Sequence, residues 1–264
     1  MRQHPATKFE WWFFAPPVAA LLSLLVLRVT GSETPVFLWL NHRTQFAGDI
    51  FWINLTTLGD GLVACVLILP FIRRKPELAW ALILSWLLAA LWIKGIKNLI
   101  STPRPLSVLS PSDFHLIGAG YKFNSFPSGH SATAAAFAAT VCFFCRQKWV
   151  RAVMIAVALL ICISRIAMGL HWPTDVLVGF LGGWLLALLA YPLSRKLQFG
   201  THPVARFIIG LILLGTAIRM FLVNQTDYSQ AFRLLQTIAL GCIVFTICDF
   251  LLWRRQVSKS RSAD

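Results

Sequence analysis

The chain has 264 residues, of which 57% are hydrophobic and only 13% are charged, and its mean hydropathy is +0.69. This composition excludes a soluble domain and indicates one integral membrane domain. The net charge of +14 does not indicate a nucleic-acid-binding protein, because the basic residues fall in short clusters at the ends of apolar segments rather than along one polar face.

The apolar segments predict an all-α membrane protein with eight spans. A transmembrane helix needs roughly 20 apolar residues. The candidate spans are residues 11–29, 50–72, 77–99, 128–145, 150–170, 174–193, 206–223 and 231–253. Trp11 and Trp12 are interfacial aromatics that lead into a full-length first span, so we expect this span to be retained rather than cleaved.

Every second connection between these spans is basic, which predicts the topology. By the positive-inside rule both termini lie in the cytoplasm, and the connections that hold residues 101–127, His171 and residues 224–230 lie outside. The basic residues are Arg2 and Lys8, Arg73 to Lys75, Arg146, Lys148 and Arg151, Arg195, Lys196 and Arg206, and Arg254, Arg255, Lys259 and Arg261.

Two polar features precede the third span. Residues 30–49 mix apolar and charged side chains, so we expect an amphipathic segment on the outer surface, with His42 and Arg43 solvated rather than bound to a headgroup. Asp60 lies inside the second span and should have a partner, for which we favour Lys94. A role for Asp60 in proton or substrate handling is the alternative.

Cationic residues and a helix start flank the connection after the third span. Lys97 ends this span, and Arg104 stands between two prolines that hold it in a stiff extended turn. After residues 106–126, a polar connection that we read as a rim, Ser128 is a good N-cap, and Gly129 and His130 lie in the first turn of the next helix. Free N–H groups there form an anion site; a capped helix with an interfacial histidine is the plainer alternative.

The stretch from Ser164 to Asp175 places ionisable residues between two apolar spans, where function is the default explanation. Pro173 suits the first turn of a helix, so a new helix begins near Trp172. His171 then lies at its start and Asp175 about one turn on, where the carboxylate can accept from one ring nitrogen and leave the other free. A buried His–Asp pair with a packing role only is the alternative.

The six cysteines lie within or at the ends of apolar spans, and we expect them to be packing residues rather than disulfides. Cys142 and Cys145 form a C-x-x-C pair, but no second cysteine or histidine pair completes a zinc site. We therefore expect no metal and no cofactor.

Taken together, three cations, a helix start and two histidines suit phosphoryl transfer, which depends on positioning and on stabilising charge. These residues resemble the signature of the type 2 phosphatidic acid phosphatase superfamily, K-x6-R-P, P-S-G-H and S-R-x5-H-x3-D. Lys97 to Pro105, Pro127 to His130 and Ser164 to Asp175 match it without a substitution. The resemblance covers about residues 50–193.

The resemblance implies a role for each matching residue. His171 would be the nucleophile that forms a phosphohistidine, Asp175 would orient it, and His130 would be the general acid. The phosphoryl oxygens would be bound by Lys97, Arg104 and Arg165, together with Ser128 and Gly129.

The same resemblance implies the organisation of the chain: a six-helix phosphatase core with an outward-facing active site and two additional C-terminal transmembrane helices. We expect a cytoplasmic N-terminus at 1–10, the core at 11–193, the additional helices at 194–253 and a basic cytoplasmic tail at 254–264.

The implied function is a metal-independent membrane lipid phosphatase at the outer face of a membrane, which we expect to be a bacterial inner membrane. Its partners are the bilayer and a lipid phosphate: undecaprenyl diphosphate, phosphatidylglycerol phosphate, phosphatidic acid or lipid A. A phosphotransferase that uses the same site is the closest alternative. The soluble vanadium haloperoxidases share the signature, but eight spans argue against them. A transporter or lipid-binding protein would leave the converging histidines, Asp175 and Arg165 without a use.

Overall fold

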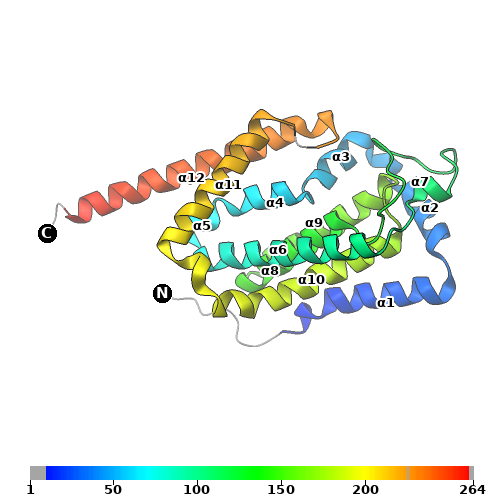
Figure 1. Ribbon diagram of the computed structural model, residues 1–264, viewed down its shortest axis with the longest axis horizontal. Helices are drawn as coiled ribbons and strands as arrows, with labels where there is room; N and C mark the ends of the chain where they lie inside the picture. Colours follow the sequence, from blue (N-terminus) through cyan, green and yellow to red (C-terminus); the bar gives the residue numbers. More distant parts are fainter. Residues whose placement is uncertain (1–9, 225, 262–264) are drawn as a thin grey trace.

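The computed structural model describes residues 10–224 and 226–261, which form helices and their connections without a strand. The predicted N-terminal cluster of Arg2 and Lys8 lies outside the described residues. The helices, drawn in Figure 1, are α1 (Ala15–Thr30), α2 (Glu33–Thr44), α3 (Asp49–Thr57), α4 (Gly61–Ile68), α5 (Phe71–Arg74), α6 (Pro76–Leu99), α7 (Pro105–Val108), α8 (Gly129–Phe144), α9 (Lys148–Ala167), α10 (Pro173–Lys196), α11 (Pro203–Leu222) and α12 (Phe232–Arg261), with short 3-10 turns η1 to η4 at Trp11–Phe13, Gln45–Ala47, Gln198–Thr201 and Ser229–Ala231.

The all-α membrane fold that composition predicts is confirmed. Five described segments are long and apolar enough to span a membrane: α6, α9, α10, α11 and the stretch that contains most of α12. Two bent pairs, α1 with α2 and α3 with α4, raise the number to seven if each pair is one span. The remaining predicted span, 128–145, is α8, an apolar helix of 16 residues.

The first two predicted spans differ from straight helices. The chain turns by 119° between α1 and α2, and Gly31 at the bend has a positive φ of 61°. The predicted amphipathic segment is thus the separate helix α2. The predicted span 50–72 bends by 58° between α3 and α4. Asp60 causes this break, because its carboxylate caps α4 by accepting from the backbone N–H groups of Leu62, at 2.7 Å, and Val63.

The expected ion pair between Asp60 and Lys94 is therefore wrong. The Asp60 side chain accepts from two backbone N–H groups, and Lys94 is exposed on α6. The N–H groups at the start of a helix can supply the hydrogen bonds that a buried carboxylate needs, without a cation. The apolar residues on both sides of Asp60 predict one continuous span, so the helix start at Asp60 is not evident from the sequence.

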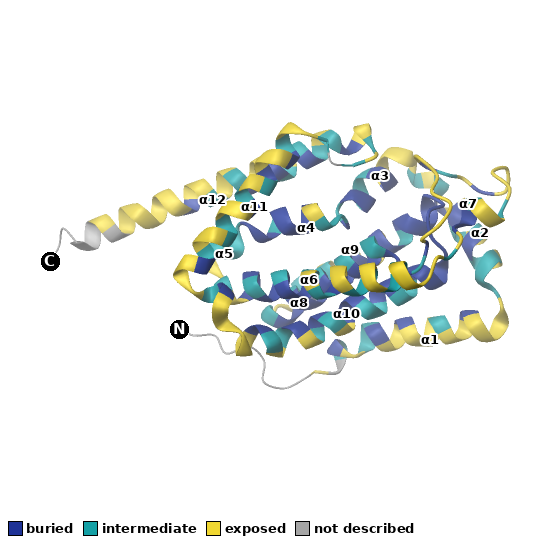
Figure 2. Ribbon diagram, in the orientation of Figure 1, coloured by how far each residue is buried: buried dark blue, intermediate teal, exposed yellow. Residues whose placement is uncertain are grey.

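Helix α8 lies at the centre of the bundle and packs against α6, α9 and α10. Its alanine-rich surface lets α10 approach closely: a Cβ at Gly183 would lie 2.2 Å from the carbonyl oxygen of Ala132, and a Cβ at Gly179 would lie 2.4 Å from that of Ser128. Burial is concentrated on these central helices, whereas the far end of α12 is exposed (Figure 2). Close helix contact through small residues is the usual packing device inside membranes, and here it fixes α8 against α10.

Helices α11 and α12 form a hairpin that packs on α4. Asp249 on α12 pairs with Arg73 and Arg74 at the end of α5. This pairing accounts for an acidic residue within the apolar part of α12. The start of α6 and the end of α10 lie at one end of the bundle, and the long connection around α7 lies at the other (Figure 1).

Candidate active site

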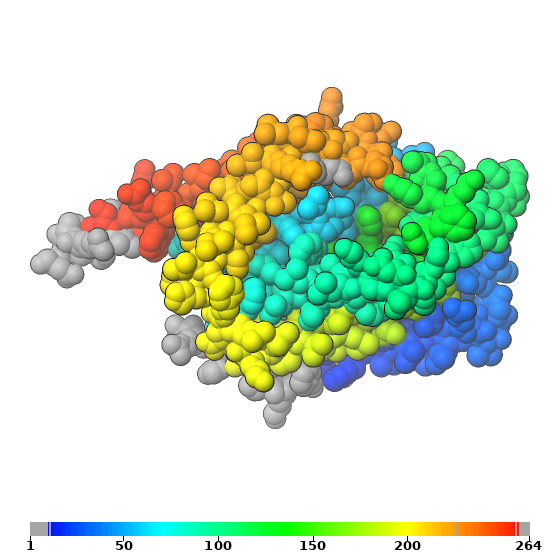
Figure 3. Space-filling view, in the orientation of Figure 1, coloured from blue at the N-terminus to red at the C-terminus, as the bar shows by residue number. Residues whose placement is uncertain are grey.

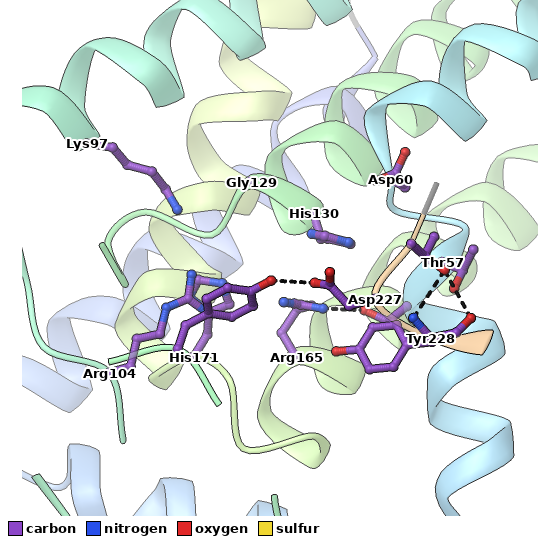
Figure 4. A pocket seen from close by; sticks show the side chains of 13 residues that line it. Thr57, Asp60, Lys97, Arg104, Gly129, His130, Arg165, His171, Asp227 and Tyr228 are labelled. Carbon is purple, nitrogen blue, oxygen red and sulfur yellow. Dashed lines mark hydrogen bonds between the residues drawn. The ribbon is translucent and has the colours of Figure 1, made fainter. Parts of the chain in front are cut away.

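A pocket of about 270 Å³ opens at the end of the bundle where α6 and α9 end and α8 begins. Figure 4 shows the predicted cations and both histidines converging on it. The pocket is lined by Thr56, Thr57, Asp60, Lys97, Arg104, Tyr121, Gly129, His130, Arg165, His171, Thr226, Asp227 and Tyr228.

The start of α10 positions His171 as the sequence predicts. The helix begins at Pro173, and Asp175 lies in its first turn. Its Oδ2 accepts from the backbone N–H of Trp172 at 2.9 Å and from the hydroxyl of Ser125 at 2.5 Å. The same oxygen lies 3.4 Å from Nδ1 of His171, which forms no hydrogen bond within the part of the chain that the structure describes. Asp175 is held by two donors and faces the imidazole as its carboxylate partner.

The environment of His171 favours a neutral ring. The side chain is 2% exposed and lies in the connection between α9 and α10. Burial, with the positive charges of Arg165, Arg104 and Lys97, holds the pKa of His171 well below its ordinary value. A neutral imidazole with a free Nε2 is the form that can act as a nucleophile.

Arg104 is held in the extended turn that the flanking prolines predict, with φ −87° and ψ 165°. Its guanidinium donates to the carbonyl oxygens of Leu170 and Phe123, both at 3.0 Å, and of Asn124 at 3.4 Å. A guanidinium has five N–H donors, so two remain for a ligand. The bond to Leu170 also ties Arg104 to the residue before His171.

Lys97 and Arg165 complete a ring of cations. Nζ of Lys97 donates to the carbonyl of Asn124 at 2.9 Å, and Nη1 of Arg165 donates to the hydroxyl of Thr56 at 2.7 Å. Arg165 is 5% exposed, and its Nε has no hydrogen-bond partner among the residues that the structure describes.

Within residues 10–224 and 226–261, none of these three cations forms an ion pair with a carboxylate. Buried charges need a partner. The pocket is therefore built to take an anion.

His130 and Gly129 line the pocket from the first turn of α8. Ser128 is the N-cap, as predicted, but its side chain is fully buried and accepts from the hydroxyl of Ser131 at 2.9 Å and from its backbone N–H. Its own N–H donates to the carbonyl of Asp175 at 3.0 Å. The structure thus places Ser128 behind the pocket wall, where it holds the first turn of α8 against α10.

Several residues that line the pocket have no motif in the sequence. Thr56 and Thr57 are the last residues of α3, and Tyr121 comes from the connection that we read as a rim. Thr226, Asp227 and Tyr228 come from the α11–α12 connection. Among the lining residues outside the three motifs, the sequence singles out Asp60, because it is an acidic residue in an apolar span.

No group of three or more His, Cys, Asp or Glu side chains that could hold a metal occurs in the described part of the chain. The cysteines it contains are all free. The candidate site thus combines histidines, cations and hydroxyl groups with the carboxylates of Asp60, Asp175 and Asp227.

The chain is similar in sequence and in structure to known proteins. The profile of the PAP2 superfamily matches residues 78–199. The lipid A 1-phosphatase of Rhizobium etli is 34% identical over 218 residues, which are 72% of this chain and 88% of that protein. The undecaprenyl-diphosphatase of Sulfolobus acidocaldarius is 27% identical over 143 residues, 54% of this chain and 63% of that protein. The crystal structure of LpxE from Aquifex aeolicus superposes with a TM-score of 0.57 and 28% identity over 61% of this chain and 94% of that chain.

Proposed function

This chain belongs to the PAP2 superfamily, and from that premise we propose that it is a membrane lipid phosphatase in which His171 forms a phosphohistidine. The observation that carries the proposal is the placement of Lys97, Arg104 and Arg165 around the buried His171 in one pocket. A phosphoryl group supplies the missing negative charge and presents phosphorus to Nε2. Its oxygens take the N–H donors that the protein leaves unused.

The first step is an in-line displacement. Nε2 of His171 attacks phosphorus, a P–N bond forms, and the P–O bond to the lipid breaks. His130 gives its proton to the departing oxygen, so that the lipid leaves as an alcohol or, from a diphosphate, as a monophosphate. Asp175 stabilises the positive charge that develops on the ring through Nδ1. The three cations stabilise the charge on the equatorial oxygens.

In the second step water attacks phosphorus. His130, now neutral, takes a proton from this water, and the P–N bond breaks. Inorganic phosphate leaves, and His171 returns to its neutral form with Asp175 still in place. The N–H groups at the start of α8, beside Gly129, support the oxygens in both steps.

We propose lipid A as the substrate, with one of its phosphates released. The reason is that a lipid A 1-phosphatase matches this chain over 88% of its own length. Undecaprenyl diphosphate is the second candidate and rests on the match to an undecaprenyl-diphosphatase.

The orientation in the membrane is proposed from charge. Arg73 to Lys75, Arg195 and Lys196 lie where α5 and α10 end, whereas the pocket lies at the opposite end of the bundle (Figure 1). The positive-inside rule then places the pocket outside the cytoplasm, at the face of the bacterial inner membrane.

The test is phosphate release by purified protein in detergent, with EDTA present, from lipid A, undecaprenyl diphosphate, phosphatidylglycerol phosphate and phosphatidic acid. His171→Ala is compared with His202→Ala, a matched control because His202 is exposed at the start of α11, outside the pocket. We expect release that survives the chelator, persists in the control and is abolished in His171→Ala. A ³²P label trapped on the parent protein in alkali, and absent from His171→Ala, identifies the phosphohistidine.

If no lipid yields phosphate, or if His171→Ala is as active as the parent, the proposal fails. Labelled phosphate that appears on an added lipid alcohol instead of in solution would replace the hydrolase with a phosphotransferase.

A further inference from the structure

The two additional C-terminal helices reach the active site through their connection. Thr226, Asp227 and Tyr228, between α11 and α12, line the same pocket as His171. Figure 3 shows this end of the hairpin, in orange, lying against the rim connection 106–126, in green. The hairpin therefore supplies a wall of the pocket in addition to its packing on α4.

The connection is held in place at both ends. The Tyr121 hydroxyl donates to the Asp227 carboxylate, and the Tyr121 ring lies over the guanidinium of Arg104 with 5.2 Å to its centroid. Ala231 is fully buried in the small core cluster that also contains Leu170.

Tyr228 packs against the same cluster and against the rim connection. Its Cε1 would lie 2.4 Å from a Cβ at Gly118, so only a glycine accommodates the ring at that position. The aromatic ring is fixed independently of its hydroxyl.

The hydroxyl of Tyr228 is aimed into the pocket. Figure 4 shows it pointing toward Arg165, with whose guanidinium it interacts. An arginine has donors only. The tyrosine oxygen must therefore face Arg165 with a lone pair, which leaves its hydrogen free for another acceptor. The acceptor that suits this position is an oxygen of the anion bound by Arg165.

We propose that Tyr228 is a further phosphate-binding residue, whose hydroxyl donates to a phosphoryl oxygen held by Arg165. This inference rests on the proposed function, and it gives the α11–α12 hairpin a direct part in binding the substrate. The geometry also explains why the ring is clamped between the rim and the core: a hydroxyl that supports a phosphoryl oxygen must be held at a fixed distance from Arg165.

The test compares Tyr228→Phe with Tyr191→Phe. Each change removes one hydroxyl and keeps the ring. Tyr191 lies near the other end of α10 against Phe143 and Phe144, outside the pocket. Binding of inorganic phosphate to the purified protein is measured by calorimetry and by the rise in unfolding temperature that phosphate causes. Hydrogen bonds to charged groups are among the stronger ones, so we expect the dissociation constant for phosphate to rise about tenfold or more in Tyr228→Phe.

We expect Tyr191→Phe to bind phosphate as the parent does, and both variants to unfold at the parent's temperature without phosphate. Equal phosphate affinity in the parent and Tyr228→Phe overturns the inference, as does an equal loss in Tyr191→Phe. Absence of phosphate binding by the parent overturns the inference together with the anion pocket. A parent that binds phosphate through Tyr228 but releases it from no lipid refutes the proposed function and leaves the inference standing.

Discussion

Replacing Asp175 with asparagine removes one negative charge and keeps the shape of the side chain. In the structure Oδ2 of Asp175 lies 3.4 Å from Nδ1 of His171 in a site where both side chains are almost fully buried. At that separation, and with an effective dielectric constant of about 20, the carboxylate stabilises a positive imidazole by roughly 5 kcal/mol. The dipole of an asparagine recovers part of this energy, so we expect kcat to fall about 100- to 1,000-fold.

A second effect acts in the same direction. Oδ2 of Asp175 both accepts from Ser125 and Trp172 and faces Nδ1 of His171, so an amide placed there loses those two bonds and donates to Nδ1 instead. This selects the ring form that carries a hydrogen on Nε2, which cannot attack phosphorus. Asp175 forms no ion pair with Lys97, Arg104 or Arg165 within the described residues, and these three donors to the phosphate remain, so KM should change by less than about threefold.

The assay is the initial rate of phosphate release against lipid concentration. Asp113→Asn, an exposed change in the rim connection, is the matched control and should retain the parent's rate. A kcat for Asp175→Asn within tenfold of the parent would show that Asp175 does not act on His171. A large rise in KM at unchanged kcat would assign it to substrate binding instead.

Two further predictions concern helix contact and pH. Gly183→Ala places a Cβ 2.2 Å from the carbonyl oxygen of Ala132, so α8 and α10 must separate; we expect a loss of about 1–3 kcal/mol in the free energy of unfolding, measured by denaturation in detergent. A Cβ at Gly241 would have nothing within 4 Å, so Gly241→Ala should leave the free energy of unfolding unchanged or raise it. Equal losses in both variants would contradict the close contact between α8 and α10. Because the pKa of His171 is lowered, kcat/KM corrected for substrate ionisation should stay high as pH falls to about 6.5 and decline only below that value. A midpoint at or above pH 6.5 would show that another group limits the rate.

The parts of the site that sequence could predict are those set by local rules. Pro173 fixes the start of α10, and this alone places His171 and Asp175 one turn apart. Pro103 and Pro105 fix the backbone of Arg104 in the same way. These features depend on neighbours along the chain, so the sequence pattern contains them.

The remaining features depend on contacts between distant segments. Tyr228 reaches the pocket because α11 and α12 pack on α4, and no pattern near residue 228 records that packing. Asn41 is similar: it is fully buried and its side-chain amide donates to the carbonyls of His115, Ile166 and Ala167 at 2.9 to 3.0 Å, thereby bracing the end of α9. In the sequence it is an ordinary polar residue of an amphipathic segment. Ser128 was placed correctly as a cap, but its burial follows from the approach of Gly179 on α10.

The length of α12 indicates where the pocket lies relative to the hydrocarbon layer of the membrane. Its 30 residues extend about 45 Å at 1.5 Å per residue, against roughly 30 Å for the hydrocarbon layer. The exposed Arg233 and Arg254 lie 21 residues apart, a distance of about 31 Å along the helix, which matches the thickness of that layer. In the proposed orientation Arg233 marks the outer boundary, and Tyr228 stands five residues before it, just beyond the layer. A lipid can thus keep its acyl chains in the bilayer while its phosphate is held in the pocket, without being lifted out of the membrane.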